Sequence, residues 1–121
     1  MPEELQLLDE WQKRLGLQDW FIVLKTSCKQ DEILPDADGQ VEYVESTKCA
    51  EIKILNPDER RSSLRPFDFE EILVHELLHC KLSLFANEEW DGLRSRIAHI
   101  TVDDLARALV DAKRSKNDKQ V

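Results

Sequence analysis

Hydrophobic residues recur along the chain first at helical spacing, then at strand spacing, and then at helical spacing again. Near the start they occupy every third or fourth position, at Leu5, Leu8, Trp11 and Leu15. This spacing places apolar side chains on one face of a helix, so it predicts an N-terminal helix over residues 2–15. A glycine follows directly, and glycine often ends a helix because it adopts the left-handed conformation at little cost.

Three segments with the character of β-strands follow this helix. Residues 20–26 are rich in aromatic and β-branched residues and predict a buried strand. Residues 41–45 and 49–55 alternate apolar and polar residues, which predicts strands with one packed face and one face that is wet or lines a cleft. Residues 29–39 contain proline, aspartate and glycine and predict the intervening loop.

Two further helices are predicted in the last third of the chain. Asp68 and a glutamate three positions later have the spacing of a capping box, and we expect a helix from there to about Phe85. Asn87 is a candidate cap for a last helix that extends to about Lys113. The Lys- and Asn-rich residues beyond it predict a frayed tail over about 114–121.

The order of these elements indicates the fold class. One helix, three strands and two helices, without alternation of strands and helices, predict an α+β protein with a small three-stranded, mostly antiparallel or mixed sheet. The 121 residues fit a single domain over 1–121. A domain of this length can form a hydrophobic core without the help of disulfides.

Charge and cysteine content narrow the classes of partner and compartment. The 17 basic and 25 acidic residues give a net charge of −8, which argues against nucleic acid as a partner because phosphates require a basic surface. The basic loop 60–65 is therefore interpreted as a solvated segment. No apolar run approaches the roughly 18 residues that cross a membrane, and the acidic N-terminus does not resemble a signal peptide. Because Cys28, Cys49 and Cys80 show no close pairing, we expect free thiols and a cytoplasmic protein.

The strongest chemical signal is the pattern HExxH at His75-Glu76-Leu77-Leu78-His79. Residues four apart lie on the same helix face, so the two imidazoles can converge on one metal ion. A catalytic zinc takes three protein ligands and a water, and a carboxylate beside it can act as the general base, the role we expect for Glu76. The amino-acid composition gives this pattern by chance with a probability of only about 0.005.

A third ligand is needed to complete such a site, and His99 is the remaining histidine. The turn between the last two predicted helices can return it to the metal. Asp103, one helical turn later, is expected to orient its imidazole and is also an alternative ligand, followed by Glu88 or Glu89. Four other residues of this helix are predicted to be buried on the face opposite His99: Trp90, Ile97, Thr101 and Ala108.

The HExxH pattern and the residues around it carry a family resemblance. Residues 69–79 resemble the active-site helix of zincin metallopeptidases, and the whole chain is similar to the very small zincins encoded by phages and prophages. These proteins share a "LGLxDW" segment, here residues 15–20, and a last helix that carries the third ligand before a segment similar to LARAL, here residues 105–109. The resemblance implies a minimal zincin-like fold, one Zn²⁺ per chain and a peptide or protein substrate.

The same resemblance implies further roles around the cleft. Metzincins require a methionine turn, which this chain lacks because Met1 is its single methionine. Aspzincins require a GTxxD pattern, and the sequence does not contain one. By analogy with zincins, the strand at residues 48–55 is expected to run along the rim of the cleft and to pair with the substrate main chain. Tyr43, Arg96 and Arg107 are candidate donors to the oxyanion of the reaction.

Two functions from different classes follow from these residues. The first is a zinc-dependent metallopeptidase in which His75, His79 and His99 hold the metal and Glu76 is the general base. The second is a non-catalytic, metal-stabilised protein-binding module on the same scaffold. A fourth protein ligand would favour the second function, whereas an open coordination position would favour the first.

Overall fold

The computed structural model describes residues 2–60, 65–83 and 92–119, with side-chain exposure described up to residue 116. Its helices and strands are α1 (Glu3–Arg14), β1 (Phe21–Cys28), β2 (Gly39–Val44), β3 (Cys49–Leu55), α2 (Phe69–Lys81) and α3 (Gly92–Lys119). Two single 3₁₀ turns, Gln30–Glu32 and Pro57–Glu59, follow β1 and β3. The predicted α+β order is confirmed, and no helix of the described residues combines the length and apolarity needed to cross a membrane.

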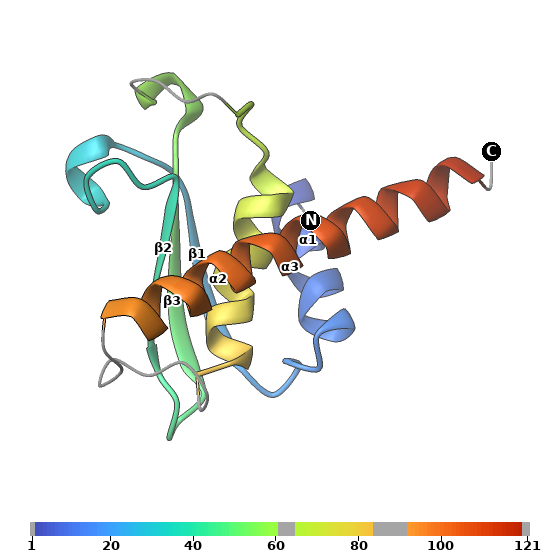
Figure 1. Ribbon diagram of the computed structural model, residues 1–121, viewed down its shortest axis with the longest axis horizontal. Coiled ribbons are helices and arrows are strands. Elements are labelled where there is room, and N and C mark those ends of the chain that lie inside the picture. The colour runs from blue at the N-terminus through green and yellow to red at the C-terminus, as the bar shows by residue number, and fades with distance from the viewer. Residues whose placement is uncertain (1, 61–64, 84–91, 120–121) are drawn as a thin grey trace.

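The three strands form one mixed sheet in the order β1-β3-β2. β1 runs parallel to β3, whereas β2 runs antiparallel to it, so the predicted mixed sheet is confirmed. α2 packs on one face of this sheet, and α1 and α3 both contact α2 (Figure 1). The central helix is therefore covered on several sides, while the opposite face of the sheet remains open.

The hydrophobic core lies between the sheet and these helices. Alternate residues of β3, Ala50, Ile52 and Ile54, point into it as their spacing predicts. The helices contribute Leu8 and Trp11 from α1, Leu73, Val74 and Leu77 from α2, and Val102, Ala106 and Val110 from α3. α2 sends apolar side chains both to the sheet and to the other helices, and its buried residues include the glutamates Glu70 and Glu76.

Strand β1 is an edge strand, and the prediction that it is buried was wrong. Phe21 is 69% exposed and Val23 is 40% exposed on the open face of the sheet. Only its alternate residues, such as Ile22 and Leu24, pack against the core. An apolar run predicts a strand buried on both faces, but here helices cover one face alone.

The two later helices end at places that differ from the prediction. α2 ends at Lys81, four residues before the predicted end, because Leu82 leaves the helical conformation. Phe85 and Asn87 lie outside the described residues. The predicted end of the last helix at about Lys113 is also wrong, since α3 continues to Lys119 and projects beyond the body of the protein (Figure 1).

Candidate metal centre

The helix that carries the HExxH pattern begins at a well-formed cap. The Asp68 side chain accepts a hydrogen bond of 3.1 Å from the amide of Glu71, as the spacing of these residues predicts. Leu73, Leu77 and Cys80 are buried, which fixes the rotation of α2 about its axis. His75 and His79, which are half-buried, thereby face the cleft between α2 and the sheet.

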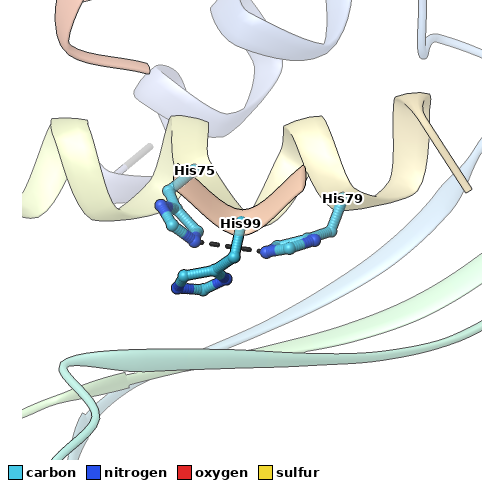
Figure 2. A group of neighbouring side chains, drawn as sticks. All are labelled: His75, His79 and His99. Carbon is cyan, nitrogen blue, oxygen red and sulfur yellow. Dashed lines mark hydrogen bonds between the residues drawn. The ribbon is translucent and has the colours of Figure 1, made fainter. Parts of the chain in front are cut away.

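His75 and His79 converge through the same ring atom. The two Nε2 atoms lie 3.2 Å apart, and the ring centroids are 4.9 Å apart. This arrangement follows from their separation by one helical turn. Figure 2 shows both rings extending from α2 toward each other.

His99 reaches the same place from α3. Its ring centroid lies 4.8 Å from that of His75 and 5.5 Å from that of His79 (Figure 2). One nitrogen from each of the three rings lies within 4.8 Å of the others. A tetrahedral zinc with nitrogen ligands at 2.0–2.1 Å separates them by about 3.3 Å, so a small inward rotation of His99 would close the set. The structure brings all three predicted ligands together, and their binding of a metal stays a prediction.

The electrostatic environment favours the neutral form of the imidazoles on α2. Burial, together with the neighbouring His75 and His99, lowers the pKa of His79 to about 4. Burial and His99 also lower the pKa of His75, while Asp103 opposes this effect. The unprotonated imidazole is the form that binds metal, so both residues are available as ligands at neutral pH.

Asp103 lies behind His75, not beside the converging nitrogens. Its Oδ1 is 3.5 Å from Nδ1 of His75, the nitrogen opposite to the one that faces His79. The expectation that Asp103 orients His99 was therefore wrong, because the crossing of α3 over α2 turns it toward His75. This position suits an acceptor that fixes the ring and its tautomer, and it does not suit the alternative role of third ligand.

Asp103 belongs to a chain of ion pairs along one wall. Arg107 contacts Asp103, and its Nε lies 3.6 Å from Oε1 of Glu71. The same carboxylate oxygen is 2.9 Å from Arg65. Arg107, a candidate oxyanion donor, thus contacts two carboxylates that line the cleft and is not itself a lining residue. Arg96, a second candidate oxyanion donor, is exposed and does not line the cleft.

Glu76 is buried next to the histidines. Its exposed fraction is 6%, and burial raises its pKa to about 8. Glu76 lies on the lining of the cleft that also contains the three histidines. At this pKa the carboxyl keeps its proton at neutral pH while no cation is near, and a cation held by the histidines would lower the pKa toward the ionised form that a general base needs.

A cleft of about 540 Å³ lies in front of these residues. One wall is α2, with Ile72, His75 and Glu76, and the opposite wall is β2, with Val41 and half-buried Tyr43. The expectation that residues 48–55 form the rim was wrong. That segment is β3, the central strand, which is paired on both sides, so β2 is the edge strand at the cleft.

The pairing of β2 with β3 leaves part of its backbone directed outward. The amide of Leu55 donates to the carbonyl of Asp38 at 2.8 Å, which makes this pair a hydrogen-bonded one. In an antiparallel ladder the alternate residues then turn their N–H and C=O groups away from the partner strand. Gly39 and Val41 are such residues, and both line the cleft.

Several residues that shape the site carry no recognisable motif. Arg60 binds Asp38 through two hydrogen bonds of 2.9 and 3.2 Å, and thereby fastens the loop after β3 to the start of β2. Gly39 follows and packs directly against α2. The sequence offers only a glycine at the start of an alternating segment as a signal. The alternative ligands Glu88 and Glu89 lie outside the described residues.

Fold and site together define a small α+β protein with a three-histidine cluster in a cleft beside an edge strand. No protein-family model, curated protein or solved structure matches the chain. The functional interpretation therefore depends on the chemistry of the residues themselves.

Proposed function

We propose that the protein is a zinc-dependent metallopeptidase with a minimal zincin-like fold. The observation that carries this proposal is the convergence of His75, His79 and His99 in a cleft that also contains the buried carboxylate of Glu76. Three imidazole nitrogens are the ligand set of a catalytic zinc that keeps one position open.

The donor set fits zinc better than it fits a closed structural site. Among the described residues the metal-ligating group contains three histidines and no fourth side chain. Cys80 lies next to His79 but is buried in the core, and burial raises the pKa of its thiol to about 12. A thiol that does not ionise is a poor ligand, so the fourth position is left for water or substrate.

The residues of the chain divide the reaction between them. Bound zinc would acidify a water molecule and polarise the scissile carbonyl. Glu76 accepts the proton of the attacking water and later gives it to the leaving amine as the C–N bond breaks. Asp103 holds His75 in the tautomer that presents Nε2 to the cleft.

The edge of β2 supplies a place for the substrate main chain. Gly39 and Val41 direct their backbone groups outward along the wall opposite the histidines. An extended peptide can add to such an edge as a further strand, which supports a peptide or unfolded protein as substrate. The three cysteines are free thiols, which supports a cytoplasmic location.

Metal analysis combined with one variant tests the proposal. We expect about one zinc per chain, and we expect Glu76→Gln to retain zinc but to lose hydrolysis of a fluorogenic peptide library. Protein that holds no zinc and takes up none when zinc is added contradicts the site. Undiminished hydrolysis by the variant contradicts the role of Glu76. Tight zinc binding without hydrolysis by the unmodified protein would favour the non-catalytic binding module instead.

A further inference from the structure

Gly39, the first residue of β2, lies so close to Ile72 and to the proposed general base Glu76 that a residue with a side chain would clash with both. A β-carbon at this position would lie 2.7 Å from Cγ2 of Ile72 and 3.0 Å from Oε2 of Glu76. Carbon atoms in favourable contact are about 3.5–4.0 Å apart, so no side chain fits here without displacement. The positive-φ glycine of the described chain is Gly16, and Gly39 is therefore required for close approach and not for its conformation.

Neither the start of β2 nor Ile72 of α2 can move easily to relieve this contact. The residue before the glycine, Asp38, is held by two hydrogen bonds from Arg60 and accepts a third from the amide of Leu55. Ile72 is β-branched and lies on the capped first half of α2, so its methyl group has little freedom. The separation between β2 and α2 is thus fixed, and the end of the Glu76 side chain is the most movable part.

We propose that Gly39 is a positioning residue for Glu76, an inference that rests on the proposed function. Its bare α-carbon leaves room for the carboxylate between β2 and α2, one helical position from His75. A methyl group at residue 39 forces the carboxylate to move, because its Oε2 is the flexible partner of the contact. The three atoms nearest to the added carbon belong to Ile72, Glu76 and Lys53 and not to a histidine, so the variant alters the base and leaves the metal-binding residues intact.

Gly39→Ala tests this inference, with Gly92→Ala as the matched control. The control makes the same chemical change at a glycine that has no atom within 4 Å of the added carbon. We expect Gly39→Ala to bind cobalt(II) with unchanged stoichiometry but with an altered visible absorption spectrum, because the carboxylate beside the ligands has moved. We expect kcat to fall by up to about 100-fold, which is the cost of a misplacement of about 1 Å, with a smaller change in KM. Gly92→Ala should match the unmodified protein in both measurements.

A compensating substitution separates positioning from a general loss of structure. Ile72→Ala in the Gly39→Ala background removes the methyl group at 2.7 Å and should restore part of the spectrum and of kcat. A Gly39→Ala protein with the unmodified spectrum and kcat overturns the inference, and so does a double variant without recovery. If the unmodified protein binds cobalt but hydrolyses nothing, the proposed function fails while the spectra still test the contact. An unmodified protein that binds no cobalt overturns both.

Discussion

At the scale of single residues, the site depends on a contact between helices that local sequence does not encode. Asp103 follows His99 by one turn, yet it serves His75 on the other helix. We expect Asp103→Asn to weaken zinc binding by about 10- to 100-fold, because carboxylates behind ligating histidines contribute this much to affinity. Competition with a chromophoric chelator measures the change. Asp104→Asn is the control, since Asp104 is exposed and should leave the affinity unaltered.

The burial of Glu76 gives the metal-free protein a pH-dependent weakness. Its pKa rises from 4.5 to about 8 on folding, so the unfolded chain loses this proton at lower pH than the folded one. Its stabilising effect is complete below pH 4.5 and is lost as the pH rises toward 8. Glu76→Gln should therefore raise the unfolding free energy at pH 8 by a few kcal/mol, since each pKa unit corresponds to about 1.4 kcal/mol.

Thermal unfolding with a chelator present, at pH 4.5 and at pH 8, measures this difference. The gain from Glu76→Gln should nearly vanish at pH 4.5, where the folded protein carries the proton and the unfolded chain carries it half of the time. An equal gain at both pH values would show that the carboxylate is not titrating. The half-buried His79 acts in the opposite sense, because its pKa falls from 6.5 to about 4 and stability is lost as the pH decreases through this range.

At the scale of elements, the end of α3 is held by charges that lie far away in the sequence. Lys113 binds both Glu10 of α1 and Glu70 of α2, and Glu70 also accepts a hydrogen bond of 2.7 Å from Trp11. Arg114 forms hydrogen bonds of 2.7 and 3.0 Å with Asp68. Residues 43 to 103 positions apart are thus joined in one network.

Removing Lys113 should destabilise the fold much more than removing a nearby lysine. The side chains of Lys113 and Glu70 are only 11% and 10% exposed, and after Lys113→Ala the Glu70 carboxylate keeps only Arg114 as a cation, at 3.3 Å. Loss of one partner of a buried pair costs about 3–5 kcal/mol, and this remaining contact places the expected cost at or below the lower end of that range. Lys116 is exposed, so the control variant Lys116→Ala should change the unfolding free energy by less than about 0.5 kcal/mol. Urea unfolding of both variants provides the comparison, and equal effects would contradict the structural role of the network.

The elements also show what the sequence can predict and what it cannot. Periodicity located α1, and Gly16 adopts the expected left-handed conformation with φ of 71° after it. Spacing alone placed His75 and His79 on one face. The predicted buried face of α3 was wrong, however, because Ile97, which is 55% exposed, Thr101 and Ala108 point outward. That face is set by the angle at which α3 crosses α2, which depends on residues from both helices.

At the scale of the whole molecule, the three histidines lie on two helices that are also held together by packing and by ion pairs. His75 and His79 belong to α2 and His99 to α3, so a metal bound between them would act as a clamp across the helix pair. A ligand that binds only the folded state stabilises it by about 4 kcal/mol at a concentration 1,000 times its Kd. Zinc should therefore raise the thermal midpoint of the protein, and chelation should reverse the rise.

If zinc joins α2 and α3 through the three histidines, its stabilising effect should be greatest close to those residues. Hydrogen exchange should slow on zinc addition in the first half of α3, around His99, and in the turns of α2 that carry the ligands. The second half of α3 should change less, because the Lys113 network holds it independently of the metal. His99→Ala should abolish both the zinc-dependent rise in the midpoint and the protection of α3, while the first half of the chain stays folded. A zinc effect of the same size in His99→Ala would show that the ion does not join the two helices.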